Sequence, residues 1–316
     1  MSAWKNQTLL LTVLLALHGA CAPEGEDDAP DPQLQSEQLE TADGLARGTL
    51  TPLVENVVSA ENLLFTSDGR LFVTGDEGIY DVHRQAGGSY VATTIALPDD
   101  CQFGGIAEAH GVIYANCYNF SDSFVYAARL ADTHGEALAF KQVSKLSGVL
   151  LANGLAADDQ GRLYVASTFI GQILRLTPSA QDPLSLSPPE TWLNGSGLLT
   201  NGIKLFEGSV YWTDGGSIKR ASLASGKKHG PVQTLVSELT VFDDLSVDQQ
   251  GIVVTETLAG LRGYSLTGKA TGVTRAPIEG PSAVARALGR AGLSQTALVV
   301  TERSANRVSI FEPKPK

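Results

Sequence analysis

Short apolar runs alternate with glycine-containing turns along most of this chain. The runs at 163–166 and 210–213 are strongly apolar, and each is followed by a shorter amphipathic run, at 172–176 and 217–223. Runs of β-branched and aromatic residues that are bounded by Asp-Gly or Gln-Gly turns are typical of β-strands. Beyond the first 48 residues, no segment shows a long 3.6-residue repeat. The pattern therefore predicts an all-β protein.

A sixfold internal repeat organises these strands. Each unit reads as an inner strand, a glycine turn, an apolar strand and a third, amphipathic strand. The second residues of the six units are Asn62, Gly105, Gly154, Gly202, Asp244 and Ala283, so the spacing runs from 39 to 49 residues. Units of about 40 residues with several short strands are typical of propeller blades.

We therefore predict a six-bladed β-propeller over residues 49–316, with four-stranded blades. The strand at 49–54 is expected to join the last blade and close the ring. A parallel α/β fold would need helices between the strands, and they are absent from the pattern. Two separate β-sandwiches are the alternative, although no linker divides this part of the chain.

The first 48 residues follow another pattern. Lys5 precedes an apolar run at 9–17, and two small residues then lead to Cys21. A charged start, a short apolar centre and a small-residue exit are typical of a secretory signal, and a membrane span would take about 20 apolar residues. We expect a signal peptide at 1–21 with lipidation of Cys21, as in bacterial lipoproteins. Plain cleavage near Ala20 is the alternative.

Residues 22–48 are rich in Pro, Asp, Glu, Gln and Ser, with almost no large apolar residue. Such a segment cannot offset the entropy cost of ordering, so we expect a disordered acidic tether. The chain carries a net charge of −11, and much of it lies in the first 48 residues, which leaves a mildly acidic body without a basic surface for nucleic acid. We expect a monomeric, exported lipoprotein at the periplasm or cell surface, held to the membrane by its lipid anchor only. A secreted soluble protein is the alternative.

Two cysteines fall in the body of the chain, Cys101 and Cys117. In an exported protein such a pair is expected to be oxidised, and the two residues flank one predicted strand pair. A disulfide here would stabilise the fold by about 3 kcal/mol through loop closure. Two unpaired buried thiols are the alternative.

Four of the six units begin with an oxygen-bearing side chain, while the other two carry inert residues there. These four first residues are Glu61, Asn153, Asn201 and Asp243. The first strand of a propeller blade lines the central channel, so the four side chains should converge at one mouth. Their hard oxygen donors favour Ca²⁺, with Mg²⁺, Mn²⁺ or Zn²⁺ as alternatives. Asn-Gly and Asp-Asp are also common turn pairs, but four such starts in register favour a metal site.

The segments that carry these residues resemble the gluconolactonase / senescence-marker-protein family and its paraoxonase relatives. The likeness is most specific in Asn-Gly-Leu before Gly-Arg-Leu-Tyr-Val, at 153–165, and in Asp-Asp-Leu-Ser-Val-Asp, at 243–248. The resemblance implies a six-bladed propeller with a central Ca²⁺ or other divalent ion that hydrolyses lactones or related esters. It implies that the metal ligands are Glu61, Asn153, Asn201 and Asp243, with Asp244 in the place of a further ligand.

The chain departs from the family at two places. Glu61 is followed by Asn-Leu instead of the Gly-Pro that is usual in gluconolactonases. The segment Phe-Gly-Gly-Ile at 103–106 stands where paraoxonases carry a catalytic His, so no histidine base carries over, and we expect His110 to be a surface residue. The segment Val-Tyr-Trp-Thr-Asp at 210–214 also resembles the YWTD repeat of receptor propellers, which are binding modules.

These observations predict a metal-dependent hydrolase whose substrate is a small-molecule lactone or ester. The ion would act as a Lewis acid on the substrate carbonyl, and Asp243 would be the general base through a carboxylate oxygen left free. A non-catalytic propeller that binds a ligand or a partner protein at its mouth is the main alternative, because a fold alone does not decide function. A lyase or synthase is a third.

Overall fold

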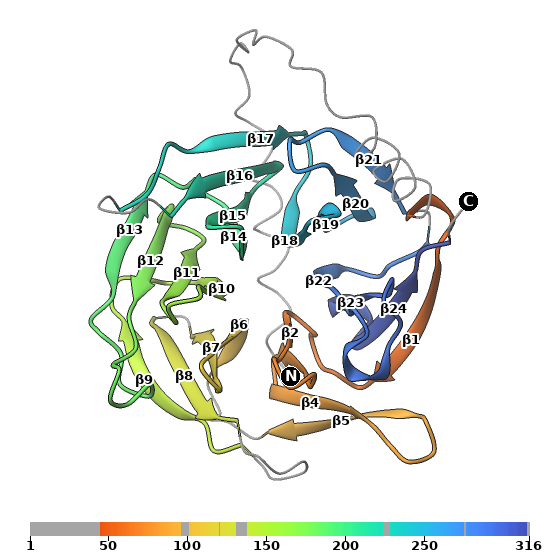
Figure 1. Cartoon of the computed structure of the whole chain (residues 1–316), viewed down its shortest axis with the longest axis horizontal. Helices are drawn as coiled ribbons and strands as arrows, with labels where there is room; N and C mark the ends of the chain where they lie inside the picture. The colour runs from red at the N-terminus through yellow and green to blue at the C-terminus, as the bar shows by residue number, and fades with distance from the viewer. Residues whose placement is uncertain are drawn as a thin grey trace, which may run out of the picture. The chain divides into compact units, whose positions relative to one another are not determined.

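The computed structural model describes residues 45–95, 101–119, 121–130, 138–223, 228–274 and 276–314. Within them the chain forms six four-stranded antiparallel sheets, which are the blades of a ring (Figure 1). The predicted six-bladed all-β propeller is therefore confirmed. The predicted signal peptide, Cys21 and the predicted tether up to residue 44 lie outside the described residues. In the part of the chain that is described, no helix has the length and apolar character needed to cross a membrane.

The strands follow one another outward from the central channel in blades one to five. Blade one holds β2(Leu63–Phe65), β3(Leu71–Gly75), β4(Gly78–Arg84) and β5(Tyr90–Ile95), and blade two holds β6(Gln102–Ala109), β7(Val112–Tyr118), β8(Ser123–Arg129) and β9(Lys141–Leu146). Blade three holds β10(Ala152–Ala157), β11(Leu163–Ser167), β12(Gln172–Leu176) and β13(Glu190–Asn194), and blade four holds β14(Thr200–Phe206), β15(Ser209–Asp214), β16(Ser217–Ser222) and β17(Gln233–Ser237). Blade five holds β18(Phe242–Asp248), β19(Gly251–Glu256), β20(Gly260–Tyr264) and β21(Ala270–Val273).

Blade six is built from both ends of the described chain. Its inner three strands are β22(Pro281–Arg286), β23(Leu298–Glu302) and β24(Arg307–Glu312), and its outer strand is β1(Thr49–Glu55). β1 runs antiparallel to β24, which confirms the predicted ring closure. Leu45 is also buried and packs in one cluster with Val300 and Phe311, so ordered packing begins inside the predicted tether.

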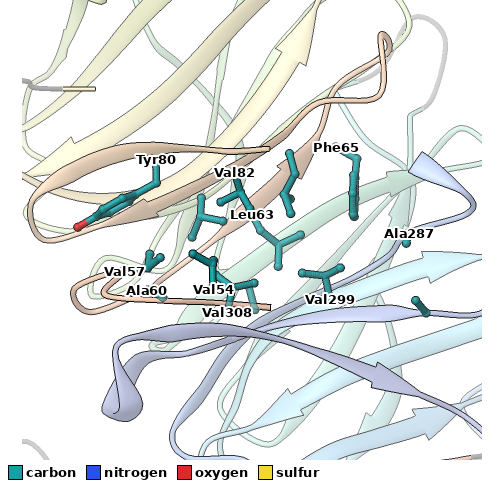
Figure 2. Close-up of a cluster of buried hydrophobic side chains, with 14 residues drawn as sticks. Val54, Val57, Ala60, Leu63, Phe65, Tyr80, Val82, Ala287, Val299 and Val308 are labelled. Atoms are coloured by element: carbon teal, nitrogen blue, oxygen red, sulfur yellow. The ribbon is translucent and has the colours of Figure 1, made fainter. Parts of the chain in front are cut away.

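The core lies between neighbouring blades. The second strand of a blade is apolar on both faces because it is covered on both sides, and every residue of β3, β11 and β23 is buried. Figure 2 shows the contact between blades one and six, where Leu63 and Val82 pack with Val299. Full burial of such a side chain stabilises the fold by about 1.5–3 kcal/mol, so the blades hold one another in place.

Blade two contains the predicted disulfide. Cys101 and Cys117 are bonded, with their Cα atoms 5.6 Å apart, which confirms the predicted pairing. His110 lies in the turn after β6, where its side chain is exposed. This turn is at the opposite end of the strand from Gly104, so the expectation of a surface histidine is also confirmed.

Candidate functional site

A repeated β-bulge sets the first residue of each blade. The pairing between the first and second strands shifts register at the same place in blades two to six, for example across Thr200/Ile203 and Phe242/Leu245. The residues inside these bulges are the first two residues of each repeat unit. A bulge re-aims side chains that a regular strand would alternate between its faces. The Asn-Gly and Asp-Asp pairs therefore belong to inner strands, which excludes the alternative that they form isolated turns.

Close packing around the axis explains the glycines at the second position of these units. A Cβ added to Gly202 would lie 2.3 Å from Asp244 Oδ1 and 2.5 Å from Asp244 Cα. A Cβ on Gly154 would lie 2.4 Å from the Asn201 carbonyl oxygen. Distances under 3 Å are not tolerated by real side chains, so glycine lets each blade approach the next at the mouth.

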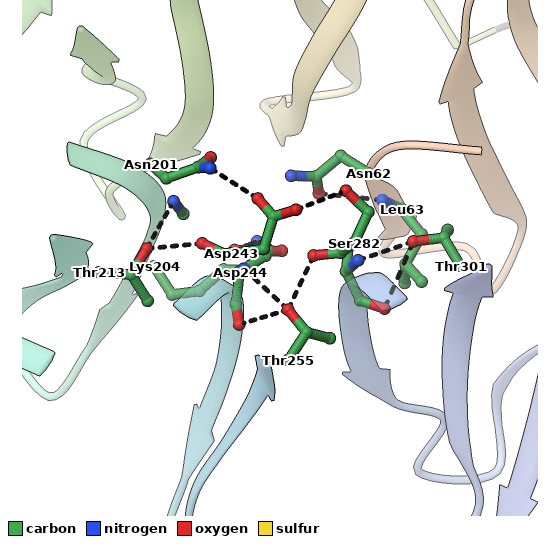
Figure 3. Close-up of polar contacts among 12 residues, drawn as sticks. Asn62, Leu63, Asn201, Lys204, Thr213, Asp243, Asp244, Thr255, Ser282 and Thr301 are labelled. Carbon is green, nitrogen blue, oxygen red and sulfur yellow. Dashed lines mark hydrogen bonds and ion pairs between the residues drawn. The ribbon is translucent and has the colours of Figure 1, made fainter. Parts of the chain in front are cut away.

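A threonine on the second strand joins each of four blades to its neighbour. In blade five, the Thr255 hydroxyl accepts the Asp244 N–H at 2.9 Å and donates to the Ser282 carbonyl of blade six at 2.8 Å. Figure 3 shows this arrangement for blades four, five and six. The same two bonds are made by Thr74, Thr213 and Thr301. The backbone that carries the candidate ligands is thus fixed across the blade boundaries.

Asp243 is held at the centre of the mouth by two neighbours (Figure 3). Its Oδ1 accepts a hydrogen bond from Asn201 Nδ2 at 2.6 Å, and its Oδ2 accepts one from Ser282 Oγ at 3.0 Å. Burial raises the pKa of the Asp243 carboxyl well above its usual range, and the charge of Glu61 raises it further. The expectation that one Asp243 oxygen would be free is wrong, because Ser282 donates to it.

Glu61 lies at the same mouth and faces a guanidinium group. Arg303 Nη1 is 2.7 Å from Glu61 Oε2. Burial raises the pKa of the Glu61 carboxyl, while Arg303 and a hydrogen bond with Ser282 act in the opposite direction. Tyr118, at the end of β7, completes this group: burial and the nearby Glu61 charge raise the pKa of its hydroxyl to about 12, so it stays protonated at neutral pH.

Asp244 is turned to a different partner. Its carboxylate accepts two hydrogen bonds from Lys204 Nζ, at 3.0 and 2.7 Å, and only 2% of the residue is exposed. Burial raises the pKa of Asp244, and Lys204 opposes this effect. Lys204 also lines a cavity of about 280 Å³, formed by inner-strand residues towards the far end of the channel, such as Val247 and Arg286. The Lys204–Asp244 pair therefore lies between this cavity and the mouth.

The structure brings Glu61, Asn201 and Asp243 into one polar group. Asn153 occupies the matching bulge of β10, is half-buried, and makes no side-chain hydrogen bond to another described residue. Ser282, Arg303 and Tyr118 were missed. Ser282 is the first residue of blade six, so the repeat could have identified it, and its treatment as inert is corrected by its bond to Asp243. No sequence pattern marks Arg303 or Tyr118.

The chemistry of this group is compatible with a divalent ion. No cluster of three or more His, Cys, Asp or Glu side chains is placed to hold a metal within the described ranges. The predicted set instead combines two carboxylates with two amides, which are hard donors. The Asn201 amide now presents Nδ2 to Asp243, and rotation by half a turn would present its oxygen. A cation between Glu61 and Asp243 would offset the repulsion that raises the pKa of Asp243.

Comparison with known proteins shows similarity in fold. The chain superposes on a gluconolactonase from Xanthomonas campestris with a TM-score of 0.63 at 13% identity, covering 86% of this chain and 91% of that chain. It also superposes on the PQQ-bound aldose sugar dehydrogenase of Streptomyces coelicolor, with a TM-score of 0.57, 17% identity, and 85% and 99% coverage. A chain of a nidogen/laminin complex gives a TM-score of 0.52, 16% identity, and 76% and 84% coverage.

The predicted resemblance to gluconolactonase propellers is therefore confirmed at the level of the fold. No sequence-family model matches the chain, and no curated protein matches it significantly. Structural neighbours at these identities include a hydrolase, a dehydrogenase and a protein found in a binding complex, so the fold alone does not select among these functions.

Proposed function

We propose that this propeller is a metal-dependent hydrolase of lactones or related esters. The observation that supports it most is the pair of buried carboxylates, Glu61 and Asp243, at one mouth of the channel. Asn201 is bonded to one of them, and both carboxyl pKa values are raised by burial. Buried acids with shifted pKa values are more common at functional sites than elsewhere. The export signal expected at 1–21 adds the proposal that the enzyme acts outside the cytoplasm, anchored through Cys21.

Glu61, Asn153, Asn201 and Asp243 would hold the ion, which when bound would polarise the substrate carbonyl as a Lewis acid. Asp243 has a carboxyl pKa shifted towards neutrality, as suits a group that accepts a proton from water. Asn201 and Ser282 fix the orientation of that carboxylate. Tyr118 keeps its proton and can donate to a developing oxyanion. Asp244 would support the ion from behind, because its carboxylate is already engaged by Lys204.

Replacement of the proposed base tests the assignment. We expect Asp243→Asn to lower kcat/KM by at least about 100-fold on a panel of aliphatic, sugar and acyl-homoserine lactones, since general-base catalysis contributes about 10²–10⁴-fold. The melting temperature should not fall, because burial already disfavours the charged carboxylate. The control is Asp182→Asn, which changes an exposed aspartate paired with Arg129. Wild-type rates in the Asp243→Asn protein would exclude this residue as the base.

Metal dependence is tested separately by elemental analysis of the purified protein. We expect about one divalent ion per chain, loss of hydrolysis in EDTA, and recovery with Ca²⁺. A protein that contains no stoichiometric ion and hydrolyses lactones equally well in EDTA would contradict the metal-dependent mechanism.

One feature favours the alternative of a binding module. Six large apolar side chains are exposed on loops at the end of the ring where the inner strands begin: Leu150, Phe169, Ile170, Leu198, Leu239 and Leu258. Exposed apolar groups gathered at one end are typical of interaction surfaces. A protein that lacks both a bound ion and activity on the lactone panel would favour this alternative.

A further inference from the structure

Arg303 places a positive charge where the proposed ion would bind. It is the first residue of the short 3-10 helix η4(Arg303–Ala305), which follows β23, and its N–H donates to the Gly280 carbonyl at 2.9 Å. Its guanidinium reaches Glu61 Oε2 at 2.7 Å. The same charge lowers the pKa of Asp243 as well as that of Glu61. Arg303 therefore counterbalances both of the carboxylates proposed to hold the ion.

The contact between Arg303 and Glu61 differs from the permanent ion pair beside it. Glu302 is fully buried and accepts hydrogen bonds at both oxygens, from Arg307 Nε at 2.8 Å and from Arg307 Nη2 at 3.0 Å. Arg303 instead touches one oxygen of Glu61, and 33% of its side chain is exposed. A two-point contact to a buried carboxylate fixes geometry, whereas a one-point contact from a partly hydrated guanidinium is readily exchanged.

We propose that Arg303 is a displaceable occupant of the cation site at the mouth. In the ion-free protein it neutralises Glu61, and it must leave the Glu61 carboxylate when a divalent ion binds there. The two cations compete because one buried carboxylate cannot hold both against their mutual repulsion. The affinity for the ion is therefore lower than the oxygen ligands alone would give. The inference rests on the ion site of the proposed function but not on hydrolysis.

Calorimetric titration with Ca²⁺ at fixed ionic strength tests the competition. We expect Arg303→Gln to bind Ca²⁺ at least about tenfold more tightly than the wild type, and Arg303→Lys, which keeps the charge, to lie between them. The matched control is Arg175→Gln, which removes an arginine paired with Glu190 on the outer strands of blade three. It should bind Ca²⁺ as the wild type does. Equal or weaker binding by Arg303→Gln, or no binding by any of the proteins, would overturn the inference.

Thermal unfolding gives a second readout that separates competition from a folding defect. Without its counter-charge, Glu61 should destabilise Arg303→Gln in EDTA, and saturating Ca²⁺ should raise the melting temperature of this variant more than that of the wild type. An increment equal to that of the wild type would contradict the proposal. If Arg303→Gln binds Ca²⁺ more tightly but no lactone is hydrolysed, the competition stands and the proposed hydrolase fails.

Discussion

At the scale of single residues, the mouth of the channel is a set of buried acids, each with its own partner. Asp243 is bonded to Asn201 and Ser282, Glu61 faces Arg303, and Asp244 is bonded to Lys204. Burial alone would favour the protonated acids, and the neighbours partly reverse that preference. The protonation of the site is therefore controlled by these partners, so changing one of them should change a pH profile without removing the fold.

Ser282 allows this to be tested. Its hydroxyl lowers the pKa of Asp243, so Ser282→Ala should raise that pKa further. A base with a higher pKa is ionised only at higher pH, and the acid limb of the kcat/KM profile on a hydrolysed lactone should move to higher pH. At a fixed pH on that limb, activity should be about tenfold lower for each pH unit by which the limb moves. Ser309→Ala is the control, because Ser309 donates to the buried Glu302 away from the mouth and should leave the limb in place. An unmoved limb in Ser282→Ala would mean that Asp243 does not set it.

At the scale of strands, the bulge and the bridging threonine turn a sequence repeat into a site. The repeat places the first residue of each unit in the sequence, and this much was predictable from the spacing of Asn153, Asn201 and Asp243. The bulge was not predictable, because Asn-Gly and Asp-Asp pairs are equally typical of turns. The threonines gave no signal either, since Thr255 is also an ordinary strand residue, and its role appears only when the next blade is in place.

Thr255 is the best position at which to test this inter-blade bond. Thr255→Val keeps the side-chain shape but leaves the Asp244 N–H and the Ser282 carbonyl without their shared partner. We expect the free energy of unfolding to fall by about 1–3 kcal/mol, the cost of a buried unsatisfied group. Chemical denaturation measures this, with Thr234→Val on the exposed face of β17 as the control. A loss no larger than that of the control would mean that water or a local shift replaces the hydroxyl.

At the scale of the whole molecule, the ring brings together residues that are far apart in sequence. Glu61 and Arg303 meet because blades one and six are neighbours, and the strand that closes blade six is β1. Blade number, closure and the Cys101–Cys117 bridge were all predictable, since each depends on spacing or on pairing. The contacts of Arg303 and Tyr118 were not, because they depend on which side chains face the channel once the ring has closed. The assignments on residues 1–44 stay predictions.

Ring closure itself can be tested by where the chain is made to begin. A protein starting at residue 45 keeps Leu45, Val54 and all of β1, and we expect it to melt as the full chain does. A protein starting at residue 56 loses these buried side chains, each worth about 1.5–3 kcal/mol, and uncovers the edge of β24. Free strand edges pair with other chains, so this shorter protein should melt at a lower temperature and form soluble aggregates that size-exclusion chromatography detects. Equal melting temperatures and a monomeric elution profile for both proteins would show that β1 is not needed to hold blades one and six together. The contact between Glu61 and Arg303 would then have to be maintained by the inner strands alone.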